Sequence, residues 1–325
     1  MKPLVTVIEP EGPESWFTSL SEVCSVRFFY PDGPVTPQQI DDLVRDSDAI
    51  IITSATALSN EQLKAAPRLQ IIAKCGGPPS NIDVEFAARC GIAVTYVPRA
   101  NTNSIAEYTI MLIIAAMRRF DLHSQVIRRG QWRAPGFLLG KDLRDCVVGI
   151  VGLGAIGTEV ARLLRAFGCR ILVYSPHARR DGDNHDLKFC ESLNELLSAC
   201  DVITVHSKVT PQTNKMFDAS AFARMKQSAV FINTARGALV DEDALASALS
   251  SGRLSAAAVD VFDTEPPSAD NPLMSCENAI LTPHSSGWTE GALWRECNGA
   301  VASVLAFYRG QEIPGLLNAD YKMHM

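Results

Sequence analysis

The sequence lacks any long hydrophobic run. Its longest apolar stretch, at residues 110–117, is far shorter than the ~20 apolar residues that a membrane-spanning helix needs. The opening segment MKPLVTVIEPEG has neither the apolar core nor the cleavage pattern of a secretory signal. We therefore expect a protein that is neither embedded in a membrane nor exported.

Excess positive charge and clustered cysteines are also missing. The formal net charge is −6 with no basic stripe, which argues against a nucleic-acid partner. The nine cysteines occur singly, without a C-x-x-C pair or a His/Cys cluster at metal-ligand spacing, so no metal site is expected. Cys24, Cys90, Cys146 and Cys169 lie in or beside apolar segments, as small core residues do. These features predict a cytoplasmic protein with reduced thiols.

What the sequence does contain is a regular alternation of short apolar strands and helical stretches. Expected strands before residue 100 are 4–8, 26–30, 49–53, 69–73 and 93–96. Those after residue 145 are 147–151, 170–174, 202–206, 229–234, 256–261 and 279–282. Alternating strands and helices are typical of parallel sheets covered by helices, so both segments are predicted to be α/β.

Two longer helices are predicted to connect these sheets. The first spans residues 105–120 with Ser104 as its N-cap, and the second spans residues 288–308 and returns the chain to the first domain. The predicted domains are therefore residues 1–99 with 288–325, and residues 100–287. A cleft between two domains is the default place for a small ligand.

The most informative stretch is VVGIVGLGAIGTEVARLLRAFGCRILVYS, residues 147–175. An apolar strand leads into a G-x-G-x-x-G turn, which opens an amphipathic helix that is followed by a second apolar strand. Gly152 allows the tight turn, Gly154 leaves room for a pyrophosphate, and Gly157 lets the helix pack closely on the strand. This context predicts a dinucleotide-binding Rossmann domain, the alternative being a glycine-rich turn in another α/β protein.

Three charged side chains follow the later strands, at the edge where parallel sheets bind ligands. They are Arg236 in NTARG, Glu265 in VDVFDTEPP and His284 in TPHSSGWT. An arginine can grip a carboxylate, a histidine can exchange the proton of an alcohol, and a carboxylate can orient that histidine. Beside a dinucleotide these groups indicate hydride transfer to a hydroxy acid, although each alone also fits a solvated loop. Trp288 either covers this site or packs in the core of a helix.

Along nearly its whole length the chain resembles the D-isomer-specific 2-hydroxyacid dehydrogenase family. The matching motifs are NIDVEFAARCGIAVTYVP, NTNSIAEYTIMLIIAAMRR, IVGLGAIG, NTARGALVDEDAL, VDVFDTEPP and TPHSSGWT. The resemblance implies a doubly wound Rossmann domain, a second, flavodoxin-like α/β substrate domain, and a homodimer with the long hinge helix near the interface. It implies an NAD(P)-dependent oxidoreductase acting on a small 2-keto or D-2-hydroxy acid. A corepressor-like dinucleotide sensor is the alternative, although no long disordered extension is available to recruit a partner.

The resemblance also implies roles for individual residues. Arg236, Glu265 and His284 match the catalytic positions. The residues expected to line the cofactor are Thr109, Gly152, Gly154, Ala155, Ile156, Gly157, His206, Thr210, Thr234 and Asp260, the last of these at the nicotinamide carboxamide.

The substrate loop departs from the family pattern. That pattern, x-G-x-G-x-D-N-I-D, supplies backbone N–H groups to the substrate carboxylate, but this chain reads KCGGPPSNID and Pro78 has no N–H to donate. Lys74, Gly76 and Gly77 are therefore expected to take more of the binding. The particular substrate is not readable from the sequence.

A second departure concerns the choice of cofactor. Ser175 stands where an acidic residue normally binds the ribose 2′-hydroxyl of NAD. A serine does not repel a 2′-phosphate, and His177 and Arg179 follow closely. The pattern favours NADP(H), while NAD(H) stays possible because Asp181 and Asp183 offset the nearby positive charges.

Overall fold

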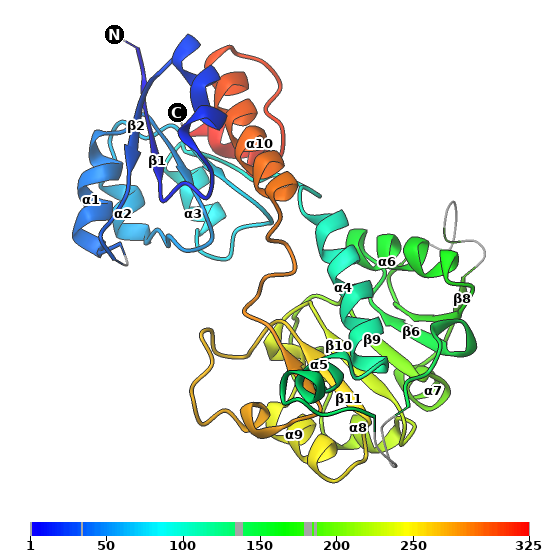
Figure 1. The fold of residues 1–325 in the computed structure, drawn as a ribbon. Helices are drawn as coiled ribbons and strands as arrows, with labels where there is room; N and C mark the ends of the chain where they lie inside the picture. Colours follow the sequence, from blue (N-terminus) through cyan, green and yellow to red (C-terminus); the bar gives the residue numbers. More distant parts are fainter. Residues whose placement is uncertain (1, 34, 134–138, 179–183, 185–186, 325) are drawn as a thin grey trace. The chain divides into compact units, whose positions relative to one another are not determined.

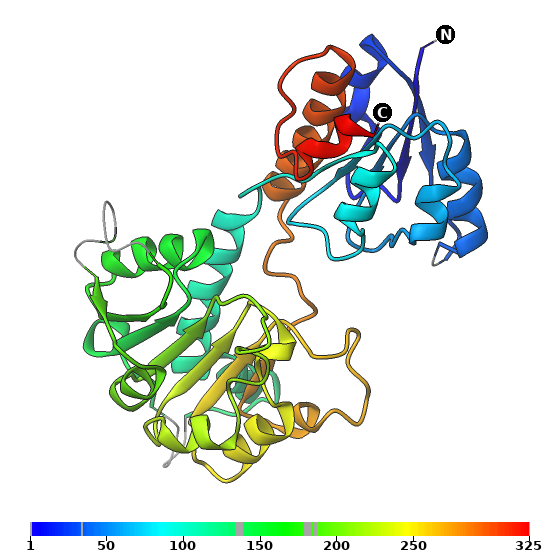
Figure 2. The ribbon, with the colours of Figure 1, turned by 180° about the vertical axis from the view of Figure 1, so that it is seen from behind.

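The computed structural model describes residues 2–33, 35–133, 139–178, 184 and 187–324. The chain forms two compact units, Met1–Asn101 with Trp288–Met325, and Thr102–Gly287 (Figures 1 and 2). Each unit has its own parallel sheet, with hydrophobic side chains packed on both faces. Within the described residues, no helix is both long enough and apolar enough to cross a membrane.

The first unit is built on a parallel sheet with the order β2-β1-β3-β4-β5. Its strands are β1 (Leu4–Ile8), β2 (Ser25–Phe29), β3 (Ala49–Ile52), β4 (Ile71–Lys74) and β5 (Ala93–Thr95). Its helices are η1 (Glu14–Glu22), α1 (Pro37–Asp46), α2 (Asn60–Lys64), α3 (Val84–Arg89), α10 (Glu290–Tyr308) and η6 (Ala319–Met323). This is the flavodoxin-like strand order, so the expected fold of this unit is confirmed.

The helices of the first unit begin where local side chains satisfy their free N–H groups. Thr36 and Gln39 form a reciprocal capping box at the start of α1, with Pro37 in the first turn. Ser59 and Gln62 do the same for α2. Apolar side chains of these helices cover one face of the sheet. The C-terminal helix α10, orange in Figure 1, covers the other face together with η1.

The second unit has a larger parallel sheet with the order β12-β11-β10-β9-β6-β7-β8. Its strands are β6 (Val147–Val151), β7 (Arg170–Tyr174), β8 (Lys188–Phe189), β9 (Val202–Val205), β10 (Val230–Asn233), β11 (Ala256–Val259) and β12 (Ala279–Leu281). Counted from β6, this is the doubly wound order of dinucleotide-binding domains with one added edge strand, which confirms the Rossmann prediction. Strands β7 and β8 are added on one side of β6, and β9 to β12 on the other, so the strand order reverses between β6 and β9. Ligands bind at such a switch point.

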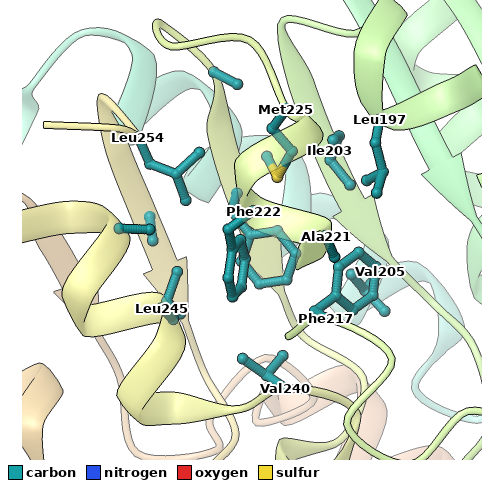
Figure 3. Packing of buried hydrophobic residues seen from close by; sticks show 14 of the residues in the cluster. Leu197, Ile203, Val205, Phe217, Ala221, Phe222, Met225, Val240, Leu245 and Leu254 are labelled. Carbon is teal, nitrogen blue, oxygen red and sulfur yellow. The ribbon is translucent and has the colours of Figure 1, made fainter. Parts of the chain in front are cut away.

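Helices cover both faces of this second sheet. They are α4 (Thr102–Met117), α5 (Phe120–Arg128), η2 (Leu143–Asp145), α6 (Ala155–Ala166), α7 (Leu193–Ala199), α8 (Ala219–Arg224), η4 (Gly237–Leu239), α9 (Glu242–Ser250) and η5 (Pro272–Ser275). The long helices α4 and α6 pack on one face. On the opposite face, shown in Figure 3, apolar side chains of α7, α8 and α9 meet the sheet around Phe217 and Phe222.

Some predicted element boundaries are wrong. The helix predicted for residues 105–120 spans Thr102–Met117, with Ser104 inside it rather than at its N-cap. It ends because the backbone turns into the left-handed region at Arg119, with a φ of 51°, before α5 begins. At the other long helix, Thr289 caps the first turn, and Trp288 precedes the helix with 68% of its surface exposed. Trp288 is therefore not a core residue.

Candidate active site

The glycine turn after β6 has a geometry that larger residues would disrupt. Gly152 has a φ of +96°, and a Cβ there would lie 2.7 Å from the backbone of His206. A Cβ on Gly157 would lie 2.2 Å from the carbonyl oxygen of Gly152. The turn therefore needs glycine at both positions, once for backbone conformation and once for close packing of the helix.

The start of α6 leaves backbone donors available. Gly154 is the N-cap and makes no side-chain capping hydrogen bond, and a Cβ placed on it would meet nothing within 4 Å. The first hydrogen bond that continues into the helix runs from Thr158 N to Gly154 O, so the N–H groups of Ala155, Ile156 and Gly157 have no acceptor within the helix. Open space and unpaired N–H groups at a helix N-terminus fit the pyrophosphate of a dinucleotide.

Ser175 follows β7 and contacts this turn. Its Oγ accepts a hydrogen bond from Leu153 N at 3.1 Å, which ties the end of β7 to the glycine turn. The hydroxyl proton is not used in that contact and can still be donated to a ligand oxygen. His177 is exposed two residues further on, whereas Arg179 lies outside the described residues.

The predicted cofactor residues after β9 have different surroundings. His206 Nε2 lies 3.0 Å from Thr204 Oγ1, and its buried Nδ1 has no hydrogen-bond partner among the described residues. Burial lowers the pKa of His206 to about 3, so the ring is neutral. Thr210 lies in an exposed turn, where its Oγ1 is 3.1 Å from Thr213 Oγ1. Of the two residues expected at the cofactor, His206 thus has a buried ring nitrogen, whereas Thr210 lies in an exposed turn.

Thr109 and Thr234 are brought together, but both are buried. Their Oγ atoms lie 3.0 Å apart, and Thr109 Oγ1 donates to Ile105 O at 2.7 Å. The exposed fractions of Thr109 and Thr234 are 0% and 4%. The pair holds α4 against the end of β10, and direct contact of either hydroxyl with a cofactor stays a prediction.

Arg236 lies in a loop that a buried amide shapes. Asn233, at the end of β10, accepts a hydrogen bond from Ala235 N at 3.0 Å and donates one to Arg236 O at 3.0 Å. Arg236 itself is exposed and donates from Nη1 to Ala235 O. A Cβ on the next residue, Gly237, would lie 1.9 Å from the carbonyl carbon of Phe262. The arginine loop therefore packs directly on the loop that leads to Glu265.

Glu265 and His284 form a hydrogen-bonded pair. Glu265 Oε2 lies 2.8 Å from His284 Nδ1, and Glu265 Oε1 accepts from Phe262 N at 3.0 Å. Because a carboxylate can only accept, Nδ1 carries the proton and Nε2 is left to meet a ligand. The His284 side chain is 49% exposed and that of Glu265 39%, so both are accessible. This is the arrangement of a histidine oriented for proton transfer.

Asp260 supports the backbone on which His284 sits. Its carboxylate accepts from Thr282 Oγ1 at 2.6 Å, Ser285 N at 2.9 Å and Ser286 N at 3.0 Å. Its carbonyl oxygen accepts from His284 N at 2.8 Å, and its side chain is 0% exposed. The structure therefore assigns Asp260 a positioning role, while the expected contact with a nicotinamide carboxamide stays a prediction.

The predicted substrate loop lies at the carboxyl end of β4, in the first unit. Lys74 is 2% exposed, and its Nζ donates to Cys75 O at 3.0 Å and to Gly77 O at 3.1 Å. Gly76 O accepts from Val97 N at 3.0 Å. Three successive carbonyl groups are thus paired, whereas the N–H groups of Gly76 and Gly77 donate to no described residue. With Gly76 at a φ of +87°, the loop offers two backbone donors to an anion.

Sequence reasoning missed Asn233 and Gly237, which shape the arginine loop. The sequence did contain a signal for Asn233, because a polar residue at the end of an apolar strand is usually buried for the hydrogen bonds it makes.

The arrangement of strand ends, dinucleotide turn and Glu–His pair defines a nicotinamide-dependent oxidoreductase.

Comparison with known proteins agrees with this class. The profile for the NAD binding domain of the D-isomer specific 2-hydroxyacid dehydrogenases matches residues 110–286. A glyoxylate reductase of Korarchaeum cryptofilum is 34% identical over 98% of this chain and 97% of its own length. A D-3-phosphoglycerate dehydrogenase of Methanocaldococcus jannaschii is 36% identical over 79% of this chain and 49% of its own.

A solved structure shows the same fold. It is that of an NADPH-dependent glyoxylate/hydroxypyruvate reductase from Sinorhizobium meliloti, with a TM-score of 0.83 and 28% identity, over 98% of this chain and 99% of that chain. The chain belongs to the D-isomer-specific 2-hydroxyacid dehydrogenase family. It is an NAD(P)-dependent enzyme that transfers hydride between 2-hydroxy and 2-keto acids, and the comparisons support this activity rather than the corepressor alternative.

We expect Asp260→Asn to weaken both the fold and the catalytic turn. In this variant an NH₂ group replaces one carboxylate oxygen, so a donor would face the N–H or O–H group that now donates to that oxygen. Loss of this hydrogen bond should lower the free energy of unfolding by about 1–3 kcal/mol. Urea denaturation measures this loss, and kcat should fall with it because His284 is displaced. Asp263→Asn, at an exposed position nearby, is the matched control. Wild-type stability and kcat in Asp260→Asn would show that the turn does not depend on this carboxylate.

Proposed function

We propose that this protein reduces small 2-keto acids such as glyoxylate and hydroxypyruvate to the matching 2-hydroxy acids, with NADPH as the preferred reductant. The observation that carries the proposal is the 2.8 Å contact between Glu265 and His284, on the same sheet edge as the dinucleotide turn. Two of the named relatives are a glyoxylate reductase and a glyoxylate/hydroxypyruvate reductase, which supports a short substrate. A cytoplasmic site of action is part of the proposal and stays a prediction.

In this proposal each residue has a separate task. The Arg236 guanidinium grips the substrate carboxylate and polarises the adjacent carbonyl group. The backbone N–H groups of Gly76 and Gly77 are assigned to substrate binding as hydrogen-bond donors. When bound, the nicotinamide supplies the hydride that reduces the carbonyl carbon. His284 donates the Nε2 proton to the forming alkoxide oxygen, and Glu265 holds Nδ1–H and stabilises the imidazolium.

We further assign residues 1–99 and 288–325 to substrate binding and residues 100–287 to dinucleotide binding. The glycine turn, with its open helix N-terminus, lies in the second of these segments. The anion-binding loop at Gly76 and Gly77 lies in the first. Truncation is a poor test of this assignment because the first segment is discontinuous.

The substitution Gly157→Val tests the assignment of residues 100–287. Loss of cofactor binding in this variant, with unchanged secondary structure, would support dinucleotide binding by this segment.

Turnover of a substrate panel tests the function and the role of His284. The wild type should oxidise NADPH with glyoxylate, hydroxypyruvate or longer 2-keto acids, followed by nicotinamide absorbance. His284→Ala should lower kcat by roughly a hundredfold or more, because general acid catalysis contributes about 10²–10⁴-fold. NADPH binding should be retained, since His284 lies outside the glycine turn.

The exposed His324 gives a control, and His324→Ala should behave as the wild type. Near-normal turnover by His284→Ala would remove the proton-transfer role. Tight NADPH binding without turnover of any substrate in the panel would favour the corepressor-like alternative instead.

The cofactor preference is tested at Ser175. In Ser175→Asp a carboxylate replaces the hydroxyl beside Leu153 N, repels a 2′-phosphate and can accept the ribose 2′-hydroxyl of NADH. We expect kcat/KM with NADPH to fall about tenfold and kcat/KM with NADH to rise, at the same substrate and salt concentration. Ser220→Asp, at an exposed position in the first turn of α8, controls for added charge. A wild type that prefers NADH by tenfold, or about 1.4 kcal/mol, would contradict the proposed preference.

We also infer a homodimer, with the α4–α5 segment near its interface. Large apolar side chains are exposed along this segment: Met111 is 47% exposed, Phe120 66%, Ile127 53% and Trp132 71%. Monomeric proteins rarely expose so many apolar groups in one region. Sedimentation should give twice the mass of the chain, and Ile127→Asp should shift the protein toward the monomer. A monomeric wild type at micromolar concentration would rule out this assembly.

A further inference from the structure

The anion-binding loop has a buried carboxyl group directly behind it. Glu296 of α10 is 7% exposed. A Cβ placed on Gly76 would lie 3.3 Å from Glu296 Oε2 and 3.5 Å from Oε1. The carboxyl group therefore lies against the backbone of the loop whose N–H groups are left unpaired. Neither the Glu265–His284 pair nor Arg236 uses it.

Charged and titratable groups act on Glu296 both from α10 itself and from other parts of the same unit. Lys74 and Arg295 attract its negative charge, Glu11 repels it, and Asn101 donates a hydrogen bond to it. The neighbouring Cys297 thiol and burial together keep the pKa of the Cys75 thiol well above its usual value. The loop thus has two carboxyl groups facing one buried ammonium group.

The charges around Glu296 set the pH at which its carboxyl group becomes ionised. With Glu11 and Glu296 both ionised, the one buried ammonium group, that of Lys74, would face two negative charges, and the Arg295 guanidinium lies at an exposed position where solvent screens its charge. Desolvation, helped by Glu11, raises the pKa of Glu296 to about 7 despite the attraction of Lys74. Desolvation also raises the pKa of Glu11. Glu296 is therefore neutral below pH 7 and gains its charge near neutral pH.

We propose that Glu296 is a positioning residue that sets the charge behind the Gly76–Gly77 loop, so that anionic substrates bind tightly only while Glu296 is neutral. This inference rests on the proposed function, in which the loop holds the substrate carboxylate. Glu296 acts through the loop and does not itself touch the substrate.

Two physical effects lead in the same direction. An ionised Glu296 places a negative charge beside the site of another anion, in a buried environment where repulsion is weakly screened. It also attracts the Lys74 ammonium, whose donors hold Cys75 O and Gly77 O in place. By linkage, an anion bound at the loop must raise the pKa of Glu296 and take up a proton near pH 7.

The first test is the pH dependence of KM for glyoxylate. For the wild type we expect KM to rise by about three- to tenfold between pH 6 and pH 8.5, the size of a partly screened like-charge repulsion. Glu296→Gln should lack this rise. Glu11→Gln removes a repelling charge, lowers the pKa of Glu296, and should move the rise to lower pH. Glu312→Gln, at an exposed position, is the matched control and should follow the wild type.

If Glu296 had only a structural role, Glu11→Gln would leave the pH midpoint of the KM rise unchanged. Turnover with a KM that is independent of pH, or that rises equally in Glu296→Gln, overturns the inference and leaves the proposed function intact. Absence of turnover with every 2-keto acid at pH 6 overturns the proposed function, and the inference with it.

A second test does not depend on catalysis. Oxalate is an anion that resembles a 2-keto acid and is not reduced, and its binding to the NADPH-loaded enzyme is measured by calorimetry in buffers of different ionisation enthalpy. The wild type should take up about 0.25–0.4 of a proton near pH 7, the uptake that a three- to tenfold linkage gives for a group that is half ionised there. Glu296→Gln should take up measurably less. Equal uptake by the two proteins overturns the inference.

Discussion

The turn that carries His284 depends on one buried carboxylate. Asp260 leaves β11 with its side chain fully enclosed and accepts hydrogen bonds from Thr282, Ser285 and Ser286. These contacts, with the bond from His284 N to Asp260 O, hold His284 in a left-handed conformation with a φ of 50°. A histidine side chain tolerates that conformation only where its surroundings impose it. The accessible Glu265–His284 pair is therefore held in place by a carboxylate that is itself fully buried.

Both units have, at the carboxyl end of a strand, backbone N–H groups that donate to no described residue, and these are the groups we propose for negatively charged ligands. In the Rossmann unit these are the first N–H groups of α6, which follow β6. In the flavodoxin-like unit they belong to Gly76 and Gly77, which follow β4, while Lys74 Nζ donates to the carbonyl oxygens of Cys75 and Gly77. Fixed dipoles of this kind need no reorganisation when an anion binds.

Most of the fold could be predicted from the sequence, because its strands are short apolar runs that end at glycine, proline or polar residues. The predicted strands agree with the observed ones to within about two residues, as expected for such patterns. The two-residue strand β8 was missed because so short a segment has no recognisable pattern. The predicted Ser104 cap was wrong because α4 starts at Thr102, three residues before the predicted start, and Trp288 is exposed because it precedes α10 instead of lying within it.

The sequence by itself determined the glycine turn, the α/β alternation and the identity of the residues that can do the chemistry. Each of these is local, because a turn, a capping box or an apolar period involves residues that are close together in the chain. Only the tertiary structure decided that Asp260 is enclosed, that Thr109 pairs with Thr234, and that Glu296 lies behind Gly76. In α10, Glu296 interrupts a buried row with Ala292, Ala300 and Val304, which signals an unusual environment but not its partner. A buried carboxyl group takes its charge from the neighbours that surround it, and contacts between distant segments of the chain supply those neighbours.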